Sequence, residues 1–148
     1  MKIEKACPVV LRHSLNTNHQ LLEILAFKHP LAGLQLVKGT IEQGELPAQA
    51  AVRELFEEAG IKACVTGHLG TQEIEATGQI WHFYQCVVSS ELPDQWQFYT
   101  QDDNGHLFEF FWYPLVMNSH PANHDWHPMF QQALLFLQQR LSLISINK

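Results

Sequence analysis

The sequence predicts an α/β fold in which a mixed sheet is covered by helices on both faces. Two observations predict this class. Helical patterns occur twice, in the middle of the chain and near its end, and the segments around them have the short, apolar and β-branched character of strands. Helices and strands must each bury an apolar face, and one sheet packed between helices achieves this for both.

The central helix is predicted from Ala48 to Ala59, with Pro47 at its first turn and Gly60 as its stop. Proline suits a first turn because its missing N–H costs no hydrogen bond there, and glycine readily adopts the left-handed conformation that ends helices. At 100° per residue, four apolar residues fall on one side: Ala48, Val52, Leu55 and Ala59.

The second helix is predicted over Met129–Leu141, where apolar residues recur at helical spacing and glutamines fill the positions between them. We expect it to pack one face on the sheet. Strands are expected at Cys7–His13, Gln20–Lys28, Leu34–Val37, Ile61–Leu69, Gln79–Val88, Gln95–Thr100 and His106–Tyr113. Periodicity alone leaves a helix open for Gln20–Lys28, and Glu73–Ala76 is expected to continue the fourth strand after a break at Gly70.

Turn-forming residues separate these segments. Thr77-Gly78 and Asn104-Gly105 each predict a hairpin turn, and Leu15–His19 and Pro121–Pro128 are expected to be a turn and a loop. With 148 residues and no repeat or low-complexity tract, residues 1–148 are expected to form a single domain.

Composition excludes several classes of protein. The formal net charge is −6 and the sequence contains no basic run, so a nucleic acid polymer is not expected as a partner. Cys7, Cys64 and Cys86 are too few and too widely spaced for a disulfide framework, which predicts reduced thiols. The N-terminal residues form neither a signal peptide nor a membrane span, and we expect a cytoplasmic protein.

The central helix carries an acidic cluster opposite its apolar side. Glu54, Glu57 and Glu58 are related as i, i+3 and i+4, so they repel one another, and Arg53 can relieve only part of this repulsion. A hard divalent cation such as Mg²⁺, which prefers carboxylate oxygens and often shares its shell with phosphates, would relieve more. The alternative is a solvated acidic face.

Residues around this cluster stand at a defined spacing, G-x5-E-x7-R-E-U-x-E-E-x-G-U, where U is aliphatic. They are Gly39, Glu45, Arg53, Glu54, Leu55, Glu57, Glu58, Gly60 and Ile61. This stretch resembles the Nudix box at all of its defining positions. The resemblance implies a Nudix-type α/β/α sandwich and a hydrolase that cleaves a diphosphate linked to another moiety, often a nucleoside.

The resemblance also implies roles for individual residues. Glu54, Glu57 and Glu58 would bind Mg²⁺ or Mn²⁺, and Glu54 is our first choice for the base that takes a proton from the attacking water. Arg53 would hold a glutamate in place, and Glu57 is the expected partner. Gly39 would allow a tight turn, Glu45 would support or ligate the metal, and Leu55 and Ile61 would anchor the box in the core.

The substrate is less well defined. Lys38, in Val37-Lys38-Gly39, is similar to the entry of the box in dinucleoside-polyphosphate hydrolases, and it either contacts phosphate or is solvated. The chain has no proline between Gly60 and Pro93, where ADP-sugar hydrolases place one, which weakens an ADP-ribose assignment. A non-catalytic nucleotide sensor is the alternative from another class, although such proteins commonly have eroded boxes. The resemblance also makes a homodimer a candidate assembly.

Further candidate residues lie outside the box. Glu109 is a candidate extra carboxylate, whereas Asp102 and Asp103 fit turn chemistry. Three histidines near the C-terminal helix are expected at the surface or as caps: His120, His124 and His127. The aromatic residues Trp81, Phe83, Trp96, Phe98, Tyr99, Phe108 and Trp112 are expected to be mostly core, with at most one or two lining a pocket.

Overall fold

A computed structural model describes residues 2–14, 21–101, 105–116 and 125–146 of the chain. In these residues, four strands precede each of two helices. The strands are β1 (Glu4–His13), β2 (Leu22–His29), β3 (Gly33–Gln35), β4 (Gly39–Thr40), β5 (Ala63–Ile74), β6 (Gln79–Val88), β7 (Trp96–Thr100) and β8 (His106–Pro114). The helices are α1 (Pro47–Ala59) and α2 (Pro128–Ile146).

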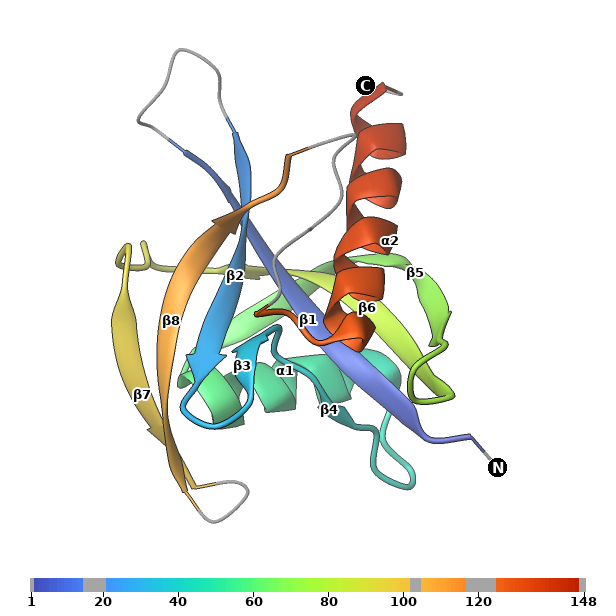
Figure 1. Cartoon of the computed structure of the whole chain (residues 1–148), viewed down its shortest axis with the longest axis horizontal. Helices are drawn as coiled ribbons and strands as arrows, with labels where there is room; N and C mark the ends of the chain where they lie inside the picture. Colours follow the sequence, from blue (N-terminus) through green and yellow to red (C-terminus); the bar gives the residue numbers. More distant parts are fainter. Residues whose placement is uncertain (1, 15–20, 102–104, 117–124, 147–148) are drawn as a thin grey trace.

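The strands form one mixed sheet in the order β5-β6-β1-β2-β8-β7, with β4 paired to β1 and β3 paired to β2. The pairing of β1 with β6 is parallel, whereas the other strand pairs are antiparallel. The central strand β1 changes partner along one edge. Its first half pairs with β4 at Lys5 and Ala6, and its second half pairs with β2 from Leu11 onward (Figure 1).

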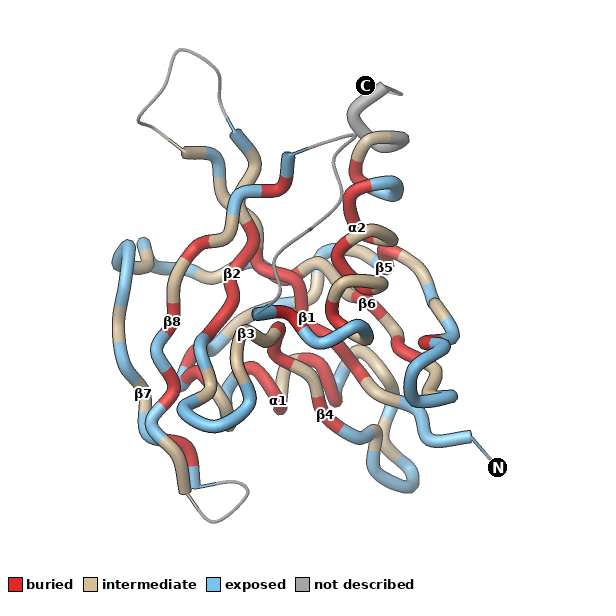
Figure 2. Tube along the Cα trace, viewed as in Figure 1, coloured by how far each residue is buried: buried red, intermediate tan, exposed pale blue. Residues whose placement is uncertain are grey.

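Each face of the sheet has its own core, one including residues of α2 and the other residues of α1. Buried stretches of β1 and of both helices are red in Figure 2. Because neighbouring residues of a strand point to opposite faces, β1 supplies both cores: Val9 packs with Leu134 of α2, whereas Val10 packs with Leu55 of α1. This arrangement confirms the predicted α/β sandwich with a mixed sheet between helices.

The helix α1 has the predicted bounds, and Gly60 ends it in the left-handed conformation at φ 72°. Its buried face differs from the predicted one. The buried residues are Ala50, Ala51, Glu54, Leu55 and Ala59, whereas Ala48 and Val52 are only partly buried. The predicted face misses Glu54 because hydrophobic periodicity cannot identify a buried carboxylate.

Two strand predictions are wrong in detail. The predicted break at Gly70 is a bulge instead, because β5 continues from Ala63 to Ile74 with register shifts at Val65/Gly67 and His68/Gly70. Glycine within a strand often marks such a bulge, and Gly70 has φ 141°. The expected strand over Leu34–Val37 contains only the end of β3, and the short strand β4 was not predicted.

The remaining strands agree with expectation. Gln20–Lys28 is the strand β2 with slightly shifted ends, so the helical alternative is wrong. Pairing of Thr100 with His106 confirms the hairpin of β7 and β8, although Asp102–Asn104 lies outside the described residues. The turn predicted at Leu15–His19 also lies outside them. The turn at Thr77-Gly78 is confirmed, since the N–H of Gly78 donates to the carbonyl of Ile74 at 2.8 Å.

The second helix begins one residue before the predicted start and is longer than predicted, reaching Ile146. His127 accepts a hydrogen bond at Nδ1 from the N–H of Met129 at 3.1 Å, which confirms a capping role for this histidine. Residues 121–124 of the loop predicted at Pro121–Pro128 lie outside the described residues, as do His120 and His124. Within the described part of the chain, neither helix is long and apolar enough to cross a membrane.

Candidate active site

The close approach of Gly39 and Glu54 is the first feature of the site. A Cβ placed on Gly39 would lie 1.8 Å from Cδ of Glu54 and about as close to both of its carboxylate oxygens. Gly39 is not among the glycines with positive φ. Gly39 is therefore needed because it has no side chain, and not for an unusual backbone conformation. The expectation that it allows a tight turn is corrected accordingly. The carboxylate of Glu54 occupies the volume that a side chain at position 39 would fill.

Arg53 is the centre of a carboxylate network. Its Nε donates to Oε2 of Glu45 at 2.7 Å and its Nη2 to Oε1 of the same carboxylate at 2.9 Å. Its Nη1 donates to Glu54 at 2.8 Å and to Glu57 at 3.1 Å. The expected contact with Glu57 is present, but the two-bonded partner of Arg53 is Glu45, because a planar guanidinium matches both oxygens of one carboxylate.

These contacts also fix the loop before α1. Arg53 Nη2 donates to the carbonyl oxygen of Thr40 at 3.0 Å, and Glu45 accepts from the N–H of Glu42 at 3.0 Å. The hydrogen bonds of Arg53 lower the pKa of the Glu45 carboxyl below its ordinary value and raise the pKa of Arg53 above its own. Loop and helix therefore form one electrostatically coupled unit.

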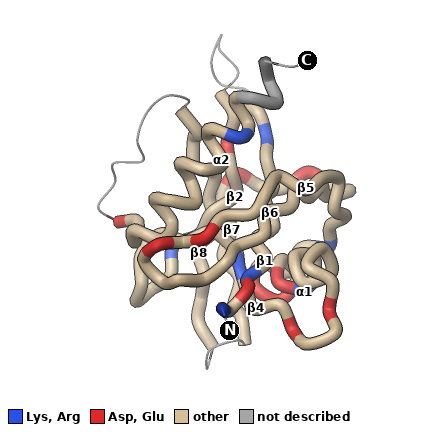
Figure 3. Tube along the Cα trace, turned by 90° about the vertical axis from the view of Figure 1, so that its right-hand side faces the viewer, with Lys and Arg blue, Asp and Glu red and all other residues tan. Residues whose placement is uncertain are grey.

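A cavity of about 730 Å³ opens beside this unit. Its lining includes the polar and charged residues Lys5, Lys38, Thr40, Glu54 and Glu58, together with His29, Leu31, Ala32, Gln35, His106 and Phe108. Glu54 is only 8% exposed. Acidic and basic residues gather where β1, β4 and α1 meet (Figure 3). The volume is in the range of small-molecule sites.

Lys5 was not identified from the sequence, because a single lysine on a terminal strand has no distinguishing pattern. Its Nζ donates to Oγ1 of Thr40 at 2.7 Å. Burial and the neighbouring ammonium of Lys38 lower the pKa of Lys5, while Glu54 and Glu58 oppose this shift. Lys38, which the sequence analysis did single out, lies with its Nζ 5.5 Å from the ring centroid of Trp81.

The donor set fits a hard divalent cation by its chemistry, since the acidic side chains offer carboxylate oxygens at a hollow lined by two lysines. Among the residues that the structure describes, no three His, Cys, Asp or Glu side chains already converge closely enough to hold a metal ion. Glu54 and Glu57 both contact Arg53 Nη1 instead. Glu54 and Glu58 are the two predicted ligands that reach the cavity.

Glu109 does not join this group. Phe108, its neighbour on β8, lines the cavity, and successive residues of a strand point to opposite faces. Glu109 lies on a second hollow with Lys28 and accepts a hydrogen bond from Nε2 of Gln97 at 3.4 Å. Asp102 and Asp103 lie outside the described residues.

The aromatic residues are mostly core, as predicted. Trp81, Phe83, Phe108 and Trp112 are buried, Trp96 and Phe98 are partly buried, and Tyr99 is the exposed one. Phe108 alone of these seven lines the cavity beside the box. Its ring centroid lies 5.3 Å from that of His29, which in turn lies 4.7 Å from that of His106.

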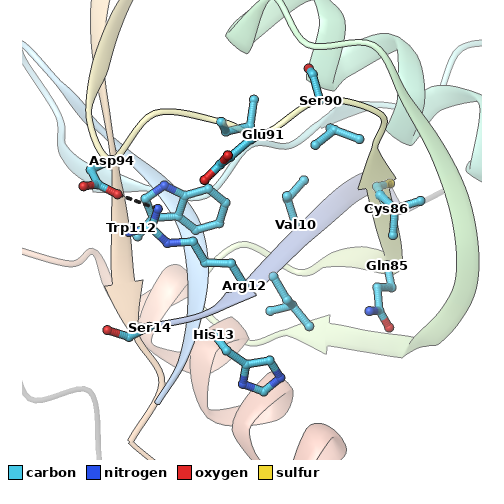
Figure 4. Close-up of a pocket in the computed structure, with 14 residues that line it drawn as sticks. Val10, Arg12, His13, Ser14, Gln85, Cys86, Ser90, Glu91, Asp94 and Trp112 are labelled. Carbon is cyan, nitrogen blue, oxygen red and sulfur yellow. Dashed lines mark hydrogen bonds and ion pairs between the residues drawn. The ribbon is translucent and has the colours of Figure 1, made fainter. Parts of the chain in front are cut away.

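A further cavity of about 530 Å³ lies at the opposite end of β1 (Figure 4). Arg12 crosses it, with its guanidinium carbon 4.4 Å from the ring centroid of Trp112 and its Nη1 donating to Asp94 at 2.8 Å. Arg12 also donates to Glu23 at 2.9 Å. None of Glu54, Glu57 and Glu58 lines this cavity, whereas Glu54 and Glu58 line the cavity beside the box.

Comparison with known proteins decides the family. The sequence model of the Nudix domain matches residues 9–133, which includes the whole box and most of the sheet. The chain belongs to the Nudix family. The enzyme class predicted from the sequence, a Nudix pyrophosphohydrolase, agrees with this match.

Solved structures share the Nudix fold at low identity. A UDP-X diphosphatase has 13% identity and a TM-score of 0.63 over 96% of this chain, and the chain spans 64% of its length. An ADP-ribose pyrophosphatase from Streptococcus suis has 13% identity, covering 95% and 93% of the two chains with a TM-score of 0.61. A C. elegans Ap4A hydrolase has 19% identity, covering 97% and 98% with a TM-score of 0.60. A sequence comparison with curated proteins finds no match.

Proposed function

We propose that this Nudix protein is a divalent-metal-dependent pyrophosphohydrolase that cleaves the diphosphate linkage of a small, nucleoside-linked substrate. The observation that carries the proposal is the position of Glu54. Its carboxylate fills the space that a side chain at Gly39 would occupy. Glu54 and Glu58 also line a cavity together with Lys5 and Lys38. Carboxylates and ammonium groups in one hollow suit the joint binding of a cation and a phosphate chain.

The roles of the side chains follow from this geometry. Glu54, Glu57 and Glu58 are proposed to hold Mg²⁺ or Mn²⁺, which when bound would offset phosphate charge and lower the pKa of a coordinated water. Glu54 is proposed to take the proton from the attacking water, since it is the most buried of the cluster and reaches the cavity. Arg53 and Glu45 keep Glu54 and Glu57 in place through their shared hydrogen bonds.

Two finer assignments remain proposals. A dinucleoside polyphosphate is a candidate substrate, supported by Lys38 at the entry to the box and by its place in the cavity. A nucleotide sensor without turnover is the alternative function, and the intact box argues against it. We also propose that the protein is cytoplasmic, consistent with its three free thiols. Residues 1–148 are proposed to form one domain, and a homodimer is the proposed assembly.

Hydrolysis across a substrate panel tests the function. The purified protein would be incubated with Mg²⁺ or Mn²⁺ and with nucleoside triphosphates, dinucleoside polyphosphates or nucleotide sugars, and the phosphorus-containing products would be quantified. We expect one class to be turned over, and Glu57→Gln and Glu58→Gln to reduce this turnover by about 10²-fold or more. Glu75→Gln, at an exposed position outside the box, is the matched control. Unchanged turnover in both box variants would contradict the proposal.

A further inference from the structure

The position of Lys5 is fixed relative to the box by the ladder between β1 and β4. Lys5 pairs with Thr40, and the adjacent pair in this ladder joins Ala6 to Gly39. The side chain is fixed as well, since Nζ of Lys5 donates to Oγ1 of Thr40 at 2.7 Å. Because Gly39 lies directly against Glu54, the same ladder sets where the Lys5 ammonium lies relative to the carboxylate of Glu54.

Lys38 lines the same cavity. It precedes Gly39 in the sequence, whereas Thr40, the partner of Lys5, follows it. Its Nζ lies 5.5 Å from the ring centroid of Trp81 and 5.7 Å from that of Phe130. Aromatic faces attract an ammonium group and limit the directions that a flexible lysine side chain takes. Two lysines from different segments are therefore held at one cavity.

The charges in this cavity balance before any ligand binds. Lys5 and Lys38 contribute two positive charges, and Glu54 and Glu58 contribute two negative ones. The four groups lie close enough that Lys38, Glu54 and Glu58 each influence the pKa of Lys5. A divalent cation on the carboxylates would leave the cavity with an excess positive charge, which attracts a phosphate chain.

We propose that Lys5 and Lys38 act as a pair that binds non-bridging phosphate oxygens of the substrate, in the cavity that Glu54 and Glu58 also line. This inference rests on the proposed function and adds a substrate-binding residue, Lys5, that lies outside the box. The competing explanation is that Lys5 is only a counter-ion for the glutamates. A counter-ion would affect cation binding but would contribute nothing to phosphate binding.

Calorimetric titration with two probes separates these explanations. The probes are Mn²⁺ alone and inorganic pyrophosphate, the latter with and without Mn²⁺, applied to the full chain. Lys5→Gln and Lys38→Gln should each weaken pyrophosphate binding about tenfold or more, as expected for loss of a charge-assisted hydrogen bond. Lys5→Gln should also tighten Mn²⁺ binding by roughly threefold, because it removes a like charge near the carboxylates.

Matched variants control for structural effects. Lys62→Gln removes an exposed lysine that does not line the cavity and should leave both affinities unchanged. Lys5→Arg retains the positive charge and should restore most of the pyrophosphate affinity. Thr40→Val removes the hydroxyl that Lys5 contacts. Because this hydrogen bond orients the Lys5 side chain, Thr40→Val should cause part of the loss of pyrophosphate affinity that Lys5→Gln causes.

Kinetics on whichever substrate is turned over gives a second readout. Lys5→Gln should raise KM about tenfold with kcat within about threefold of the wild-type value, since the lost contact is made before the chemical step. Pyrophosphate affinity and KM that are unchanged in Lys5→Gln would overturn the inference while leaving the proposed function intact. If the wild-type protein bound no Mn²⁺, the proposed function would fail, and metal-free pyrophosphate binding would still decide the role of Lys5.

Discussion

Arg53 binds Glu45 through two parallel hydrogen bonds, from Nε at 2.7 Å and from Nη2 at 2.9 Å. Glu45 lies in the loop before α1 and Arg53 lies on the helix, so the pair joins the two parts of the box. The side chain of Glu45 is 14% exposed and that of Arg53 is 23% exposed. This partial burial makes the pair stronger than an ordinary surface ion pair.

Glu45→Gln should lower the free energy of unfolding at pH 7 by about 1–2 kcal/mol, because it removes the charge from a hydrogen-bonded carboxylate. The pKa of Glu45 is lowered in the folded state, so its contribution is present above the unfolded value of 4.5 and is lost as pH falls through the folded value. Urea unfolding at pH 7 and in steps below pH 4.5 measures this. The difference between wild type and variant should shrink on acidification, and a constant difference would contradict the assignment.

Gly39→Ala should disable the site without unfolding the protein. The new methyl group would lie 1.8 Å from Cδ of Glu54, so that carboxylate must move out of its position. We expect kcat/KM to fall about 10²-fold and Mn²⁺ affinity to fall with it. Gly67→Ala is the matched control, since a Cβ there meets nothing within 4 Å. Activity of Gly39→Ala within twofold of the wild type would show that the position of Glu54 is unimportant.

Glu54→Gln should lower kcat about 10²- to 10⁴-fold, because an amide cannot accept the proton of the attacking water. The protein should remain folded, since glutamine can still accept the hydrogen bond from Nη1 of Arg53. Single-turnover rates measured at saturating Mn²⁺ separate this loss from weaker cation binding. A single-turnover rate equal to that of the wild type would exclude Glu54 as the base.

Gly60→Ala should destabilise the protein by about 2 kcal/mol or more. Gly60 has φ 72°, which an alanine adopts only with strain, and the new Cβ would lie 2.5 Å from Cε2 of Phe98. In the double variant with Phe98→Ala, the loss of stability caused by the contact should disappear, and the loss caused by backbone strain should remain. Urea unfolding of both single variants and the double variant separates these contributions, and strict additivity would show that the contact with Phe98 does not matter.

Some features could be predicted from the sequence because they have local patterns. The box helix, its stop at Gly60 and the strand Gln79–Val88 all follow from short-range propensity, and the structure agrees with each. The continuation of β5 through Gly70 depends on its pairing with β6 and on Phe136 of α2, whose Cζ would lie 2.6 Å from a Cβ at this position. Such long-range contacts leave no local pattern.

The residues of the candidate site also differ in whether the sequence alone could identify them. Arg53, Glu54 and Glu57 were identified by their spacing, and in the structure both glutamates accept a hydrogen bond from Arg53. Lys5 could not be identified, because it reaches the box only through the pairing of β1 with β4. Glu109 was proposed from its residue type, but the face of β8 on which a residue lies depends on register, which the sequence does not define.

The parallel pairing of β1 with β6 has a consequence for protein synthesis. Glu4 pairs with Ile80, so β1 acquires this neighbour only after α1 and β5, which lie between the two strands, have also been synthesised. A nascent chain ending before Gln79 contains every acidic residue of α1 and both cavity lysines. It lacks Trp81, whose ring lies against the ammonium group of Lys38. Ribosome-stalled chains that end on either side of β6 should therefore differ in Mn²⁺-dependent protection from proteolysis.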